Sequence, residues 1–158
     1  MKIKLPFRLL NIEGDGYHLQ VKVRINGKPA LMIVDTGASR SVFDRTQIEK
    51  YIGAEKIGDH DRLSTGLGTS TMKSQFVVLK SFTIKGIRLQ NFGAVILDLQ
   101  HVNHTYDIIG LPAVAGVLGS DILVRLNAVI DFRRKEITLT RTVKTARGKS
   151  SGPKKRKR

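Results

Sequence analysis

An alternating segment near the N-terminus constrains the fold most. From His18 to Ile25 (HLQVKVRI), Leu, Val, Val and Ile alternate with Gln, Lys and Arg, which is the period of a strand with one buried face. Asn26-Gly27 follows, a dipeptide preferred in tight hairpin turns because both positions tolerate positive φ. Ala30–Val34 (ALMIV) then predicts a second, more buried strand, antiparallel to the first. The chain is therefore expected to be a β protein.

The rest of the chain contains more strand patterns and one helix pattern. Asp121–Leu126 (DILVRL) predicts a helix because its apolar residues fall on one side, and Ser120 or Asp121 is expected to cap its start. Gly86 predicts a turn, and Asn91 and Gly93 predict breaks. Extended segments are expected at Thr71–Lys80, Phe82–Ile84, Ile87–Leu97, Ala128–Phe132 and Glu136–Thr140. The predicted class is all-β, mainly antiparallel, with one short C-terminal helix.

Length and composition limit the classes of protein that the chain can be. With 158 residues, 41% of them hydrophobic, it suits one domain with a core. It contains no Cys, so a disulfide framework and a thiolate zinc site are excluded. Polar residues interrupt the N-terminal segment, which does not resemble a signal peptide. No apolar run of about 18 residues exists, so we expect no membrane span and a cytoplasmic location.

The net charge of +15 is concentrated at the C-terminus. Residues 141–158 carry nine Lys or Arg and no acid, whereas 1–140 hold the other 19 basic and all 13 acidic residues. We predict a folded domain over 1–142 and a disordered basic tail over 143–158. The tail is either simply solvated, a non-specific contact for polyanions, or an address signal of the nuclear-import type. It lacks aromatic residues for base stacking, so specific reading of nucleic acid is not expected.

The segment Leu31–Ser39 (LMIVDTGAS) is the candidate for chemistry. Four apolar residues end in Asp35, and small residues follow at once. Thr36 and Ser39 offer hydroxyls, and Gly37 lets backbone N–H groups approach, so a carboxyl here is poised for acid–base work. For a bare Asp-Thr-Gly the alternative is a strand-terminal Asp that caps a turn.

With its flanking residues this motif resembles the active-site motif of aspartic proteases, in both the pepsin and the retroviral branches. A second landmark of that family, two apolar residues and a Gly before a short helix, matches Val117-Leu118-Gly119. Ile109-Gly110 fits this landmark less well, because the helix pattern directly follows Leu118-Gly119. The later strands of the family resemble Ile130-Asp131-Phe132 and Ile137-Thr138-Leu139. The resemblance covers about residues 18–140 and implies a retropepsin-like closed β-barrel.

The resemblance also implies an activity and roles for residues. The activity would be that of an aspartic-type endopeptidase, with Asp35 catalytic in the loop Asp35–Ser39, which includes Ala38. Thr36 would hydrogen-bond across a dimer axis, Gly37 would present its N–H to the catalytic carboxyls, and Ser39 would contact the outer carboxylate oxygen. A hairpin flap with Thr65, Gly66, Leu67 and Gly68 at its tip would close over a peptide. No metal or organic cofactor is implied.

This chemistry needs two carboxyls that share one proton. The sequence contains a single Asp-Thr-Gly. The second carboxyl must therefore come from another copy, which predicts a twofold homodimer with the site on its axis. The expected partners are a second copy and a peptide or protein substrate.

Other polar residues receive simpler interpretations. The stretch His101–Asp107 is expected to be a solvated loop, and His101 and His104 are only loosely spaced for metal binding. Asp121 is expected to cap a helix, and Asp131 to anchor a turn. Two other functions stay open: a catalytically silent module for dimerisation or peptide binding, and a nucleic-acid-associated protein acting through its basic tail.

Overall fold

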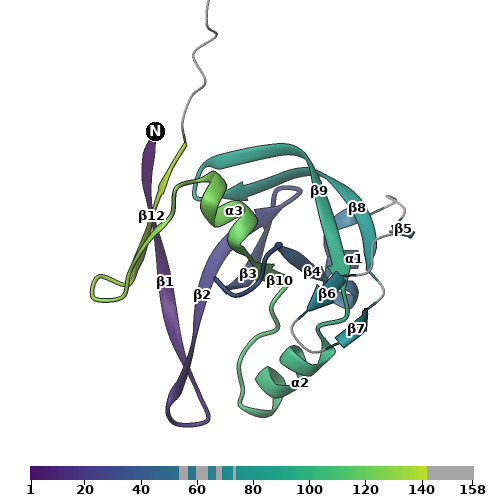
Figure 1. Ribbon diagram of the computed structural model, residues 1–158, viewed down its shortest axis with the longest axis horizontal. Coiled ribbons are helices and arrows are strands. Elements are labelled where there is room, and N and C mark those ends of the chain that lie inside the picture. The colour runs from purple at the N-terminus through teal and green to yellow at the C-terminus, as the bar shows by residue number, and fades with distance from the viewer. Residues whose placement is uncertain (54–56, 60–63, 67–68, 73, 142–158) are drawn as a thin grey trace, which may run out of the picture.

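The computed structural model describes residues 1–53, 57–59, 64–66, 69–72 and 74–141 (Figure 1). The predicted tail, 143–158, and two residues of the predicted flap tip, Leu67 and Gly68, lie outside the described residues. No helix in the described ranges is long and apolar enough to cross a membrane.

The fold is built mainly of strands. Six strands form a closed ring in the order β2-β3-β10-β4-β9-β8, which the pairing of β2 with β8 completes. The strands are β1 (Lys2–Ile12), β2 (Gly16–Ile25), β3 (Lys28–Val34), β4 (Val42–Asp44), β5 (Gly58–Asp59), β6 (Ser64–Gly66), β7 (Thr69–Met72), β8 (Gln75–Ile84), β9 (Ile87–Leu97), β10 (Gly116–Leu118), β11 (Val129–Asp131) and β12 (Glu136–Thr140). The predicted class, all-β with a closed barrel, is confirmed.

The first hairpin follows the sequence pattern. Strands β2 and β3 pair antiparallel from Leu19 opposite Val34 to Ile25 opposite Lys28. Asn26 and Gly27 both have positive φ, 49° and 82°, as a two-residue turn of the primed type requires. The Asn26 side chain also donates to the backbone oxygen of Tyr51 and accepts from the backbone nitrogen of Ser81. The turn is thereby fixed to two other segments.

The long hairpin of β8 and β9 differs from the prediction. Both strands are continuous, and Gly93 pairs opposite Val78, so the break expected at Gly93 is absent. At Asn91 the register passes over one position. Asn91 adopts a left-handed conformation with φ 48°, and the buried face of β9 shifts there from Leu89 to Phe92 and Ala94. The hairpin therefore bends at Asn91 while its ladder stays in one register.

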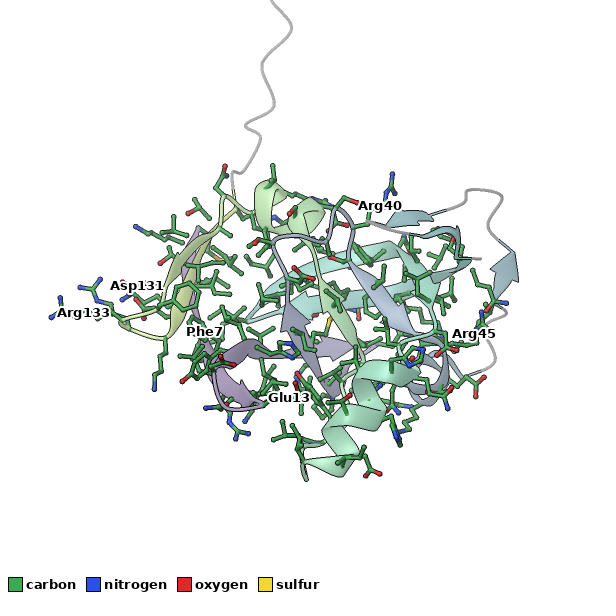
Figure 2. All side chains as sticks on the ribbon, turned by 60° about the horizontal axis from the view of Figure 1, so that its bottom comes forward. Phe7, Glu13, Arg40, Arg45, Asp131 and Arg133 are labelled. Carbon is green, nitrogen blue, oxygen red and sulfur yellow. The ribbon has the colours of Figure 1, made fainter. Side chains whose placement is uncertain are left out.

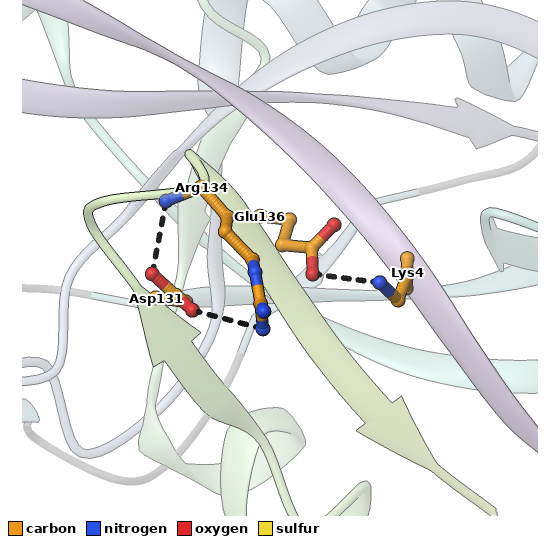
Figure 3. A network of polar contacts seen from close by, with 4 residues as sticks. All are labelled: Lys4, Asp131, Arg134 and Glu136. Carbon is orange, nitrogen blue, oxygen red and sulfur yellow. Dashed lines mark hydrogen bonds and ion pairs between the residues drawn. The ribbon is translucent and has the colours of Figure 1, made fainter.

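Strands β1, β12 and β11 extend the sheet beyond β2, and β5 pairs with β8. A turn anchored by Asp131 joins β11 to β12 (Figure 3). Strand β1 pairs with β12 on one side and with β2 on the other. The carboxylate of Asp131 accepts from the backbone nitrogen of Arg134 at 2.9 Å, as predicted for a turn anchor. Lys4 on β1 forms an ion pair with Glu136 on β12 at 3.0 Å, an exposed contact that contributes little to stability.

Helix α3 (Ser120–Arg125) confirms the predicted C-terminal helix, which begins one residue earlier than expected. Its N-cap position is Gly119 rather than Ser120 or Asp121, but the Asp121 carboxylate accepts from the backbone nitrogen of Ile122 in the first turn at 2.8 Å. Both side chains are used in contacts with the loop that follows β3.

Helix α1 (Arg45–Ile52) was not predicted. Its N-cap is Asp44, which is fully buried and accepts from the backbone nitrogen of Gln47 at 3.0 Å. Its carboxylate also accepts from the Thr46 hydroxyl and from the backbone nitrogen of Leu99. These three hydrogen bonds satisfy the buried carboxylate. They also connect the end of β4 to the first turn of α1 and to Leu99, just after β9.

Helix α2 (Gln100–Ile108) replaces the solvated loop expected at 101–107. It forms because Tyr106 and Val102, one helical turn apart, pack with Leu10 and Ile33 in a second apolar cluster outside the barrel. The Tyr106 hydroxyl lies 2.7 Å from Nδ1 of His18. Burial raises the pKa of Tyr106 to about 12, so the phenol is neutral at ordinary pH.

Candidate active site

Asp35 stands where two parallel strands end together. Strand β3 pairs with β10 in parallel, with Val34 opposite Leu118. The backbone nitrogen of Asp35 donates to the Leu118 oxygen at 3.0 Å. Val34 is buried, whereas Asp35, Thr36 and Gly37 are exposed. The apolar strand thus delivers a carboxyl to the surface at the end of the barrel.

A tight turn fixes the carboxyl. The Gly37 backbone nitrogen donates to Oδ1 of Asp35 at 2.8 Å, and the Ala38 nitrogen donates to the Asp35 backbone oxygen at 3.2 Å. Oδ2 has no hydrogen-bond partner among the described residues, and the Ser39 hydroxyl does not reach the carboxylate within one chain. One oxygen is therefore held by the backbone and the other is open to solvent or to a ligand.

The turn is fastened to the start of α3. The Ser120 nitrogen donates to the Ala38 oxygen at 2.8 Å, and the Ser120 hydroxyl donates to the Thr36 oxygen at 2.7 Å. Gly119 permits this approach, since a Cβ there would lie 2.6 Å from the backbone of Arg40 and 2.8 Å from the Ala38 oxygen. Leu118 and Gly119 thus lie directly against the Asp35 loop, whereas Ile109 and Gly110 lie at the end of α2.

A second fastening involves residues that the sequence did not single out as a pair. The buried Ser41 donates through both its nitrogen and its hydroxyl to Oδ1 of Asp121, at 2.8 and 2.7 Å. The same hydroxyl accepts from the Gly119 nitrogen at 2.9 Å. Between Ser39 and the buried Ser41, the Arg40 side chain points to solvent (Figure 2). The base of the loop is therefore rigid and its rim is exposed.

The predicted flap corresponds to a small separate sheet. Strands β6 and β7 pair antiparallel, with Ser64 opposite Met72 and Gly66 opposite Thr69. Thr65 and Gly66 belong to β6, while Leu67 and Gly68 lie outside the described residues. A hairpin thus occupies the segment where the flap was expected.

An apolar hollow lies between Thr36 of the Asp35 loop and α3. It encloses about 340 Å³ and is lined by Thr36, Ser120, Leu123, Val124, Asn127, Ala128 and Ile130. Val124, which lines the hollow, is 75% exposed. Large apolar side chains gathered on a surface mark a site of interaction.

His101 and His104, the two histidines considered as metal ligands, lie on α2. Among the described residues, no group of three or more His, Asp or Glu side chains could hold an ion. The chemistry that this site offers is that of a positioned carboxyl.

Comparisons with known proteins agree with this geometry. The family model described as "Aspartyl protease" matches residues 21–122. None of the curated proteins matches the sequence. A retropepsin-like aspartic protease from Rickettsia conorii has a similar structure, with a TM-score of 0.54 and 19% identity, over 88% of this chain and 89% of that one.

Two further solved structures have the same fold. EIAV protease complexed with the inhibitor HBY-793 gives a TM-score of 0.53 and 19% identity, over 78% of this chain and 100% of that one. The retroviral protease-like domain of Ddi1 from Leishmania major gives 0.50 and 17%, over 77% and 87%. The predicted retropepsin-like fold is thereby confirmed.

Proposed function

This chain belongs to the aspartyl protease family, and on that premise we propose that it is an endopeptidase whose active site forms when two copies each supply Asp35. The observation that carries the proposal is the exposed Asp35 carboxyl, held by the Gly37 nitrogen at the common end of β3 and β10. An exposed carboxyl with one oxygen fixed by the backbone keeps its other oxygen available to a ligand. Here Oδ2 is open among the described residues.

The reaction requires a second carboxyl close to the first. Two carboxyls about 3 Å apart cannot both ionise, so they share one proton. The ionised member takes a proton from a water held between them, and the water oxygen attacks the carbonyl carbon of the peptide. The protonated member donates its proton to the carbonyl oxygen. Because one proton must be retained, activity is expected at acidic to near-neutral pH and is lost at high pH.

A homodimer is the source of that second carboxyl in this proposal. The sequence contains one Asp-Thr-Gly, and the apolar hollow with Val124 adjoins Thr36 of the same loop. A twofold axis through this end of the molecule would bury that hollow against its own copy and bring the two loops together. Thr36, exposed beside the hollow, is then the residue that meets the partner loop.

The proposal assigns the remaining loop and flap residues to supporting roles. The Gly37 nitrogen holds the carboxyl and the Ala38 nitrogen holds the Asp35 backbone oxygen, while Ser39 would turn toward the carboxyl when substrate binds. The segment that includes β6 and β7, with Thr65, Gly66, Leu67 and Gly68, would act as a flap that covers an extended peptide. The substrate is a peptide or protein, and no cofactor is required.

Replacement of the acid tests the function. Asp35→Asn preserves the shape of the side chain and an oxygen for the Gly37 nitrogen, so the fold is expected to persist. Cleavage of a peptide library should disappear, while Asp107→Asn, a change at an exposed acid on α2, should leave cleavage unchanged. A library cleaved equally well by Asp35→Asn and by the wild-type chain would refute the proposed chemistry.

A further inference from the structure

A second hollow lies away from the Asp35 loop, between the bent hairpin and the C-terminal strand. It encloses about 710 Å³, within the usual size range of ligand sites. The end of the β8–β9 hairpin, α3 and the end of β12 lie side by side there (Figure 1). The lining residues are Arg88, Leu89, Gln90, Asn91, Phe92, Gly93, Arg125 and Arg141, named here the arginine groove.

The charge of the arginine groove is uniformly positive. Arg88, Arg125 and Arg141 come from three different elements, and none of the eight lining residues is acidic. All three side chains are exposed, and no ion pair or side-chain hydrogen bond engages them within the described residues. Arg134, by contrast, pairs with Asp131. Three unpaired guanidinium groups around one hollow repel each other and are stabilised by an anion.

The neutral part of the groove suits an oxygen-rich ligand. Gln90 and Asn91 are exposed and carry amide donors. The left-handed conformation of Asn91 bends β9 at this point. Phe92 packs inward against Phe43 and Phe82, so its ring is not free to stack on a base. The groove therefore offers donors for phosphate oxygens and no means of reading bases.

The charge continues along the chain from the rim of the groove. Arg141 ends the described residues and is the first of nine basic residues in 141–158, a segment without an acid. A small anion would engage the groove alone, and a flat membrane surface cannot enter a hollow. An extended chain of phosphates can occupy the groove and still reach the basic segment.

We propose that the arginine groove binds the phosphate backbone of a single nucleic-acid strand, without regard to sequence. The inference is independent of the peptidase proposal, since it uses none of the residues of the Asp35 loop. RNA and DNA share the chemistry that the groove recognises.

The test measures binding of labelled single-stranded RNA and DNA 20-mers to the full chain over a range of salt concentrations. The triple variant R88Q/R125Q/R141Q removes the three groove charges. The matched control R8Q/R45Q/R133Q removes three exposed arginines outside the groove, with the same change in net charge. Since each phosphate contact in a single strand contributes about 0.7 to the slope of log K against log salt, the groove variant should lower that slope by about 2.

We expect the groove variant to bind at least about tenfold more weakly than the control at low salt. Equal weakening in both variants would overturn the proposal, since net charge alone would then explain binding. An unchanged salt slope in the groove variant would also overturn it. A groove-dependent preference for anionic lipid vesicles over both oligonucleotides would do the same.

A second measurement on the wild-type chain does not depend on how the variants fold. A photoreactive single strand, cross-linked to the full chain and mapped by mass spectrometry, should label peptides that contain residues 88–93. Cross-links confined to the basic tail or to surfaces outside the groove would contradict the assignment.

Discussion

The hydroxyl oxygen of Ser41 lies 2.7 Å from Oδ1 of Asp121. The two residues are 80 positions apart, and their contact joins the end of the Asp35 loop to the first turn of α3. The same hydroxyl accepts from the nitrogen of Gly119, the N-cap of α3, so one buried hydroxyl holds the start of α3 at two points. Asp35 is consequently held by a base that is fixed by long-range bonds.

Removal of this hydroxyl is expected to loosen that base. Ser41→Ala leaves the Gly119 nitrogen without its acceptor in a buried position, which costs about 1–3 kcal/mol in free energy of unfolding. Chemical denaturation measures this loss. Ser120→Ala, which removes an exposed bond to the Thr36 oxygen, should cost less. If Ser41→Ala were as stable as the wild type, the Ser41–Asp121 contact would not contribute to the stability of the fold.

Gly119 is expected to tolerate no side chain. A Cβ there meets backbone atoms of Arg40 and Ala38 within 2.6–2.8 Å, and backbone cannot swing aside as a side chain does. Gly119→Ala should destabilise the fold by about 1–3 kcal/mol and displace the Asp35 loop, with loss of peptidase activity. Gly58→Ala, whose Cβ would lie 3.8 Å from its nearest neighbour, is the control. A fully active and stable Gly119→Ala would contradict the observed packing.

A charge on the apolar surface beside Thr36 is expected to prevent pairing of two copies. Val124 is 75% exposed and lines the hollow next to Thr36, so Val124→Asp should leave stability within about 0.5 kcal/mol. Analytical ultracentrifugation should show a shift to the monomer, and cleavage should fall in proportion. Ile108→Asp, at a 70% exposed position on α2, should change neither. An active, dimeric Val124→Asp would rule out this surface as the contact.

Tyr106 predicts a dependence of stability on alkaline pH. Its pKa in the folded chain is about 12, against 10.0 for an ordinary tyrosine, because burial disfavours the phenolate. A raised pKa contributes stability below about pH 10 that is lost as pH rises toward 12. Burial also raises the pKa of Tyr51, so the wild-type chain carries both effects.

Tyr106→Phe separates the contribution of Tyr106 to this pH dependence from that of Tyr51. The variant should lose the bond to His18, about 0.5–1.5 kcal/mol at neutral pH. It should also lose less stability than the wild type between pH 10 and 12. Unfolding by urea at several pH values measures the difference. Parallel curves for the two chains would show that Tyr106 does not titrate as its burial requires.

The elements that were predicted correctly from the sequence are those whose pattern is local. The alternation of His18–Ile25, the Asn26-Gly27 turn and the apolar strand before Asp35 each identify themselves within ten residues, and all are present. The short helix after Leu118-Gly119 is also local, and it lies where the resemblance to aspartic proteases requires it.

Sequence reasoning missed one long-range contact and two helices. Ser41 and Asp121 are far apart in the chain, and no local pattern pairs them. Helices α1 and α2 did leave signals: Asp44 followed by Gln47 resembles a capping box, and Val102 with Tyr106 has the spacing of one helical face. Their polar composition concealed them, because each buries only one narrow face.

Mixing intact and inactivated chains tests most directly whether Asp35 from two copies forms one site. Wild-type chain is mixed with increasing amounts of Asp35→Asn, the two are allowed to exchange, and cleavage is measured at constant total protein. If a site needs an intact acid from each copy, activity follows the square of the wild-type fraction, and an equal mixture retains about a quarter of the activity. An equal mixture that retains about half would mean that each copy acts alone, and would contradict the account.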